Sequence, residues 1–241
     1  MRCAVMQPTY FPWAGYFNLI GSVDVFVFLD DAQYERGTWQ NRNRVLLNGV
    51  PHWLTVPVVR ERLGDAINEC ETDDRHSWRR KHLALLHQVY GKHPFGSDIL
   101  ALSERFVGDE KITRLAALNL QIVSEICAKF GIKTRMLRSS ELDIRGSRSE
   151  RLAKICGLLD CDEYLSPPGA LPYLTEDRFC ELTKVKLLIN EYESKAYAQR
   201  GSELFVSHLS VIDVVANLGW DGAATYVSRN SETRLITFCP S

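Results

Sequence analysis

The chain has 241 residues, of which 45% are hydrophobic and 24% are charged, and its formal net charge at pH 7 is -1. This composition predicts a folded globular protein with a sizeable core. A nearly neutral chain has no overall field that would attract a polyanion or an anionic bilayer, so the composition argues against nucleic-acid and membrane-surface binding.

Membrane insertion and export are also disfavoured. The apolar run at the N-terminus is broken at Gln7 and Pro8, and no window reaches the roughly 18 uncharged apolar residues that span a bilayer. Seven cysteines occur without the paired spacing of a zinc site or a redox motif. We therefore expect a cytoplasmic protein with no bound nucleic acid, no membrane insertion and no metal-ligand set.

Hydrophobic periodicity and turn residues predict alternating strands and helices. The first half is predicted to contain a strand at 3–6, a helix at 14–21, a strand at 24–29, hairpin strands at 44–47 and 52–56, and a helix at 74–90. A strand, a helix and a strand in succession form the βαβ unit of a parallel sheet. Asn48-Gly49 is a strong two-residue turn signal, and we expect this antiparallel hairpin at a sheet edge.

The second half continues the alternation. It is predicted to contain a helix at 112–130, a strand at 133–137, a helix at 150–159, strands at 163–165 and 185–189, and a helix at 210–218 closed by Gly219. The predicted fold is α/β, with a Rossmann-like, open, mainly parallel sheet. We expect a single domain over 1–241, with a β-hairpin and helical insertion at about 39–110.

The loop after the first predicted strand is the first candidate binding segment, because open α/β sheets bind ligands at this position. Its candidate substrate-binding residues are Gln7, Tyr10, Trp13, Gly15 and Tyr16. The helix that follows points free amide groups at the loop, which favours an anionic ligand. The alternative is that the aromatic rings pack as core where the helix meets the sheet.

Two carboxylates follow the next strand. Asp30 and Asp31 can bind Mg²⁺, or one can act as a base, and Gln33 beside them is a candidate substrate ligand. The alternative is that one acid caps a turn and the other is solvated. His76 is a further candidate base, with a solvent-exposed surface position as its alternative.

A cluster of amides and guanidiniums precedes the hairpin. Gln40, Asn41, Arg42, Asn43 and Arg44 offer many donors for a carboxylate, a phosphate or a sugar hydroxyl. Alternation along an extended segment would place Gln40 and the arginines on one face and the asparagines on the other.

The loop after the strand at 163–165 is the second candidate binding segment. Ser166 and the amide of Gly169 can contact a ligand there, or the loop can be a rigid turn.

Several of these segments together resemble one family. The motifs in residues 7–17, 24–33, 39–44, 164–166 and 209–213 resemble the WbqC-like protein family, and the resemblance covers nearly the whole chain. Its members are bacterial proteins often encoded with O-antigen or other surface-polysaccharide genes, which implies a role in making sugar precursors. Ser166-Pro167-Pro168 departs from the expected pattern, which has a second glycine near the serine.

The resemblance and the implied role in making sugar precursors lead to three functional hypotheses. The first is a transferase that moves an acyl or aminoacyl group onto the amine of a nucleotide-linked amino sugar. Its donor would be carried by CoA or by phosphopantetheine on an acyl carrier protein. The second is an adenylate-forming or nucleotidyl-transferring enzyme that uses Mg·ATP, and the third is a non-catalytic sugar-binding or scaffold protein. A homo-oligomer formed through the hairpin edge is a further expectation.

Overall fold

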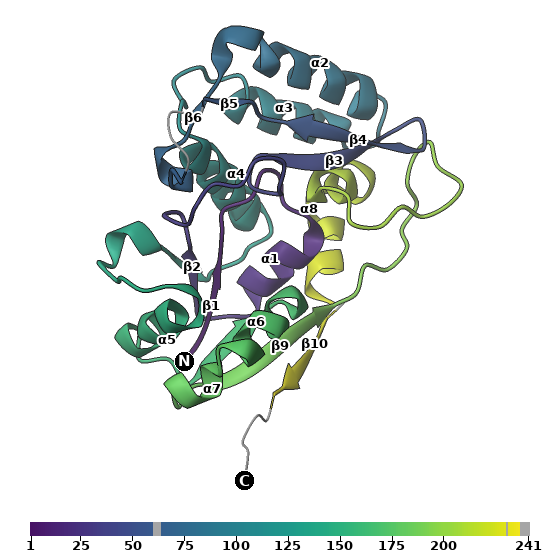
Figure 1. Ribbon diagram of the computed structural model, residues 1–241. Coiled ribbons are helices and arrows are strands. Elements are labelled where there is room, and N and C mark those ends of the chain that lie inside the picture. Colours follow the sequence, from purple (N-terminus) through teal and green to yellow (C-terminus); the bar gives the residue numbers. More distant parts are fainter. Residues whose placement is uncertain (60–63, 230, 237–241) are drawn as a thin grey trace.

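The computed structural model describes residues 1–59, 64–229 and 231–236 (Figure 1). Its strands are β1 (Arg2–Met6), β2 (Val25–Phe28), β3 (Arg42–Leu47), β4 (Val50–Thr55), β5 (Val58–Val59), β6 (Glu71–Thr72), β7 (Arg135–Arg138), β8 (Glu163–Ser166), β9 (Lys186–Tyr192) and β10 (Ser231–Leu235). Its α-helices are α1 (Ala14–Gly21), α2 (Trp78–Tyr90), α3 (Gly96–Phe106), α4 (Leu115–Lys129), α5 (Arg148–Leu158), α6 (Leu171–Glu176), α7 (Phe179–Leu182) and α8 (Val211–Ser228). Across these described ranges, none of the helices has the length and apolar character needed to cross a bilayer.

The main sheet has Rossmann-like topology. Its strand order is β10-β9-β8-β1-β2-β7. β1 runs parallel to β2 and β8, β7 runs parallel to β2, and β9 runs parallel to β8, whereas β10 is antiparallel to β9. Numbered along the chain, these strands follow the order 3-2-1-4-5-6 of the dinucleotide-binding fold. The predicted mainly parallel α/β sheet is confirmed, and β10 is an edge strand that the sequence patterns did not indicate.

Alternate side chains of the central strands enter two separate cores. Ala4 and Phe26 pack with α1, α4 and α8, whereas Cys3 and Val25 pack with α5, α6 and α7. Neighbouring residues point to opposite faces because strand side chains alternate with a period of two. The sheet is therefore covered by helices on both faces (Figure 1), which is why its strands are apolar throughout.

The predicted hairpin forms, but its predicted place at a sheet edge is wrong. β3 and β4 pair around Asn48 and Gly49, which both have the positive φ of a tight hairpin turn. The pair is a separate two-stranded sheet, and the edges of the main sheet are β7 and β10. Val45 and Leu54 are fully buried in the larger core, so the hairpin packs by one face over the neighbouring elements instead of extending the sheet (Figure 1).

Two helix boundaries also differ from prediction. The last helix does not close at Gly219, because α8 resumes beyond that residue and places Ala223 and Val227 in the core. Gly219 itself has a non-helical φ of 72° and kinks the element. α2 begins at Trp78 and not at Asp74, because Ser77 has a φ of 50° and separates it from a short 3-10 turn.

Candidate functional site

The strand order reverses between β1 and β8, since β2 follows on one side and β9 on the other. Ligands of open α/β sheets bind outside the carboxyl ends of the strands at such a point. Two adjoining cavities of about 250 Å³ each lie there and share Met6, Thr9 and Trp39. We call the first the amide cleft, whose lining includes Gln7, Gln40, Pro167, Ala170 and Tyr173. We call the second the indole cleft, whose lining includes Pro12, Trp13, Tyr16, Asn43 and His208.

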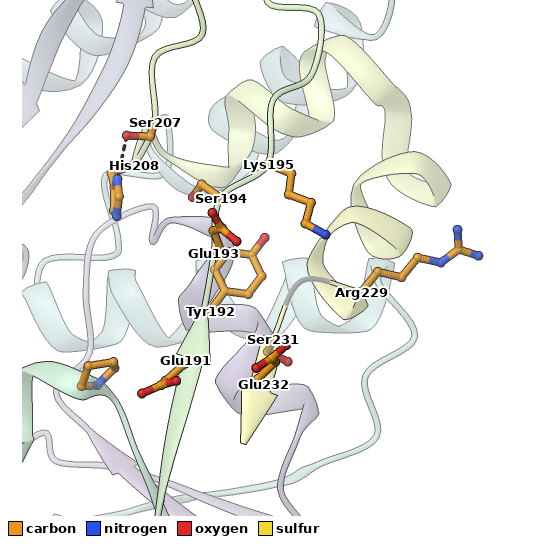
Figure 2. Close-up of a pocket in the computed structure, with 11 residues that line it drawn as sticks. Glu191, Tyr192, Glu193, Ser194, Lys195, Ser207, His208, Arg229, Ser231 and Glu232 are labelled. Atoms are coloured by element: carbon orange, nitrogen blue, oxygen red, sulfur yellow. Dashed lines mark hydrogen bonds between the residues drawn. The ribbon is translucent and has the colours of Figure 1, made fainter. Parts of the chain in front are cut away.

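A larger cavity of about 770 Å³ opens beyond the carboxyl end of β9. We call it the polar pocket, and its lining includes Glu191, Glu193, Lys195, Ser207, His208 and Glu232. Figure 2 shows Ser207 and His208 on one side of this pocket, with Lys195 and Arg229 across from them. His208 lines both the polar pocket and the indole cleft, so the two cavities adjoin at this residue.

His208 is held from several directions. Its ring stacks on Trp13 with centroids 4.8 Å apart, and its Nδ1 lies 2.9 Å from the hydroxyl oxygen of Ser207. Its backbone oxygen accepts a hydrogen bond from Arg44 at 3.2 Å. Its φ is 58°, a left-handed conformation that is uncommon outside glycine and is concentrated at functional sites. Sequence reasoning missed this residue, although it directly precedes the 209–213 motif.

Hydrogen bonds fix the irregular segment between β9 and α8 that carries His208. Tyr197 donates a hydrogen bond to the buried carboxylate of Asp213 at 2.7 Å. The side chain of Gln199 both donates to and accepts from the backbone of Val206, at 2.9 and 2.7 Å. Long irregular segments held by specific contacts are commonly functional.

Trp13 explains the glycine two positions later. A Cβ on Gly15 would lie 2.4 Å from the Trp13 indole ring, so only glycine leaves room for the ring where it stands. The ring forms a wall of the indole cleft and contacts Tyr192 edge-on, with centroids 5.4 Å apart. Tyr16 lines the same cleft and donates to the backbone oxygen of Gln7 at 3.0 Å, and burial raises the pKa of its hydroxyl so that it stays neutral.

We expect Gly15→Ala to lower the free energy of unfolding by about 1–3 kcal/mol, the usual cost of overpacking a filled site. The indole ring must shift away from His208 or into the indole cleft. Urea denaturation measures the first effect and tryptophan fluorescence the second. Gly169→Ala is the matched control, because a Cβ at Gly169 meets nothing within 4 Å. Equal stability of the two variants would contradict this account of Gly15.

The structure places two predicted ligand residues mainly in internal contacts. Tyr10 is fully buried, and its hydroxyl lies 3.1 Å from Nδ1 of His82. Asn43 reaches the indole cleft, but its amide donates to the backbone oxygen of Phe11 at 2.7 Å and accepts from the backbone amide of Arg44 at 2.8 Å. Asn43 therefore fastens the hairpin to the first loop, where Phe11 has a φ of 41°.

Asn43→Ala should lower the free energy of unfolding by about 1–3 kcal/mol, because it leaves buried backbone groups without a partner. Hydrogen exchange of the amides in residues 9–16 should accelerate at the same time. Asn43→Asp keeps the acceptor for Arg44 but loses the donor to Phe11, so it should also be destabilising. Wild-type stability of both variants would show that this hydrogen-bonded clamp is dispensable.

The arginines of the cluster lie on indole faces. The Arg42 guanidinium carbon is 4.1 Å from the ring centroid of Trp53, and that of Arg44 is 5.8 Å from Trp39. Among the described residues, neither arginine has a carboxylate ion-pair partner. Both arginines are half-buried, whereas Asn41 is buried. Neither arginine lines the two clefts or the polar pocket.

The carboxylates of Asp30 and Asp31 are bound by arginine side chains and serine hydroxyls. Asp30 is fully buried and forms an ion pair with Arg138 at 2.8 Å. Asp31 accepts from Arg151 and Ser139. Partial burial raises the pKa of the Asp31 carboxyl, but these two hydrogen bonds outweigh burial and hold the pKa below its usual value. No group of three or more histidine, cysteine or acidic side chains in the described part of the chain is arranged to hold a metal ion.

The other predicted candidates line neither cleft nor the polar pocket. His76 is exposed, lies 3.7 Å from a carboxylate oxygen of Asp73, and shares a separate cavity of about 350 Å³ with Asn41. The side chain of Gln33 is exposed.

The second loop contributes different residues from those expected. Ser166 is fully buried, and neither it nor Gly169 lines the amide cleft. Pro167, Ala170 and Tyr173 do so in their place. They lie after the end of β8, in the loop where the sequence predicted Ser166 and Gly169 as ligand residues.

Comparison with known proteins identifies relatives. The WbqC-like protein family matches residues 7–225. An uncharacterized protein of Mycobacterium tuberculosis, Rv1507c, is 33% identical over 220 residues, which cover 90% of this chain and 94% of the relative. No solved structure matches the chain significantly. The matched range begins at Gln7 and includes His208 and every residue that lines the two clefts except Val5 and Met6. The chain belongs to the WbqC-like protein family.

Proposed function

We propose that this protein transfers an acyl or aminoacyl group to the amine of a nucleotide-linked amino sugar. The observation that carries the proposal is the position of His208, which lines both the small indole cleft and the large polar pocket. Two substrates that enter from opposite sides would meet at this ring. An imidazole is also the side chain whose ordinary titration lies nearest neutral pH, which suits a general base.

The size and polarity of the polar pocket and of the indole cleft suit two different substrates. The polar pocket of about 770 Å³ has the volume of a nucleotide-sized site, and its carboxylates suit an amine-bearing ligand. The indole cleft of about 250 Å³ is lined mainly by apolar and aromatic side chains, which suits a short acyl group. Arg42 and Arg44, which have no carboxylate partner among the described residues, support phosphate binding beside Trp39 and Trp53.

The proposed reaction is the aminolysis of a thioester. The amine nitrogen attacks the thioester carbonyl carbon, a C–N bond forms and the C–S bond breaks. Nε2 of His208 takes the proton from nitrogen and returns it to the departing thiolate. Ser207, through its contact with Nδ1, would fix the ring orientation. The donor would be a CoA or phosphopantetheine thioester, the latter carried by an acyl carrier protein.

A ligand panel tests the proposal. Purified protein would be screened by thermal shift against nucleotide-linked amino sugars, their hydroxyl analogues, CoA thioesters and Mg·ATP. A ligand at 100 times its Kd adds about 2.7 kcal/mol of stability. We expect a shift with an amino sugar nucleotide and, with a thioester present, an amide product by mass spectrometry.

Each other outcome contradicts acyl transfer. A shift with Mg·ATP and release of pyrophosphate would support the adenylate-forming hypothesis instead. Binding of a sugar nucleotide without product across the donor panel would support a non-catalytic sugar-binding protein.

A further inference from the structure

The hydrogen bonds around Gln40 fix the orientation of its side-chain amide. Gln40 is buried, with 2% exposure. Its Oε1 accepts from the backbone amide of Glu35 at 2.9 Å, so this atom must be the oxygen. Its Nε2 donates to the backbone oxygen of Gln33 at 3.4 Å and to Oε1 of Gln7 at 2.9 Å. All the strong hydrogen-bonding positions of this amide are therefore used within the protein.

The orientation of Gln40 determines that of Gln7. Because the Gln40 amide group can only donate at this contact, Gln7 must present its oxygen to it. The Nε2 group of Gln7 is left over, and it has no hydrogen-bond partner among the described residues. Gln7 is half-buried and lines the amide cleft, so this free group is a donor available to a ligand.

The side chains around Gln7 indicate which kind of ligand oxygen would accept a hydrogen bond from its Nε2 group. Among the described residues that line the amide cleft, none carries a charged side chain. Tyr173 lines the same cleft, and burial raises the pKa of its hydroxyl, which therefore remains a neutral group able to donate. Phosphates are usually bound by cations or by several backbone amides. Neutral donors in an uncharged cleft suit a neutral carbonyl oxygen better.

We propose that the amide cleft binds the carbonyl oxygen of an acyl group through Nε2 of Gln7, and that Gln40 is the positioning residue that sets this polarity. The inference rests on the proposed function for the identity of the acyl group. The carbonyl would lie where the two clefts adjoin, at Met6, Thr9 and Trp39, with its oxygen toward Gln7 and its carbon toward the indole cleft.

The donor orientation is tested without any ligand. In protein labelled with ¹³C and ¹⁵N, the side-chain amide nitrogen of Gln40 should show a through-hydrogen-bond coupling to the side-chain carbonyl carbon of Gln7. Gln40→Glu replaces that donor by an acceptor, so Gln7 should rotate and become the donor in this contact. Detection of the Gln7 amide as the donor in the wild-type protein would overturn the proposal.

Ligand binding is tested with butyramide labelled with ¹³C at the carbonyl, a neutral acyl probe without a leaving group. We expect a carbonyl shift typical of an accepted hydrogen bond in the wild-type protein, and an apparent Kd at least about tenfold higher in Gln7→Glu and Gln40→Glu. Gln33→Glu is the matched control, because it makes the same charge change on an exposed side chain. We expect its Kd to stay within about twofold of wild type.

The outcomes separate this inference from the proposed function. Absence of butyramide binding to the wild-type protein, or equal binding to Gln7→Glu, would overturn the carbonyl site even if an amide product is found. Binding that depends on Gln7, in a protein that makes no amide product, would support the carbonyl site and contradict only the transfer reaction.

Discussion

His208→Asn is expected to lower kcat for amide formation by about 100-fold or more, the usual contribution of a general base. Asparagine is the chosen replacement because it tolerates a φ near 58° better than most residues, so the backbone of the segment should be preserved. KM for the amino sugar nucleotide should change little, since the imidazole acts on the reacting proton.

The control for this variant is His52→Asn, which removes an exposed imidazole from β4. Its kcat should equal that of the wild-type protein. Circular dichroism and the thermal midpoint would show that both variants are folded. A His208→Asn enzyme with wild-type kcat would remove His208 from the reaction.

Asp213→Asn is expected to make the stability rise with pH in mildly acidic solution, where the stability of the wild-type protein changes little. Burial raises the pKa of the Asp213 carboxyl to about 6, although Tyr197 and Tyr90 donate hydrogen bonds to it. The folded protein thus keeps a proton that the unfolded chain, with an ordinary value of 3.8, has lost. The contribution of Asp213 is fully present below about pH 4 and is lost as pH rises through about 6. A shift of about 2 units corresponds to about 3 kcal/mol.

His82 acts in the opposite direction over almost the same range. Burial lowers the pKa of its imidazole from 6.5 to about 4, so its contribution is present above pH 6.5 and is lost as pH falls through about 4. This effect is also about 3 kcal/mol. The two groups nearly cancel between pH 4 and 6.5 in the wild-type protein. Asp213→Asn should therefore become more stable as pH rises over this range.

The matched variant is His82→Gln, whose amide can still donate to the backbone oxygen of Thr55 and accept from Tyr10. Its stability should fall as pH rises from 4 to 6. Urea denaturation of both variants and the wild-type protein at pH 4.5, 5.5 and 6.5 measures these slopes. Parallel slopes for all three proteins would contradict the assignment of either buried group.

The location of the candidate site could be predicted from sequence, but the state of its side chains could not. The loops after β1 and β8 were found because apolar strands end there and proline follows, which are local features. Asp30 and Arg138 pair across 108 residues, and that pairing depends on β2 and β7 lying side by side. No local pattern of residues contains this information.

The sequence by itself determined the order of most strands and helices, although not β10, α6 or α7, since hydrophobic periodicity and turn residues act over a few neighbours. It also indicated the family, because motifs along the chain match residue by residue. Only the tertiary structure decided that Tyr10 and Asn43 make internal contacts and that Gln7 keeps a free donor. It alone brought His208 onto Trp13, because contacts between residues 195 positions apart are set by the packing of whole elements.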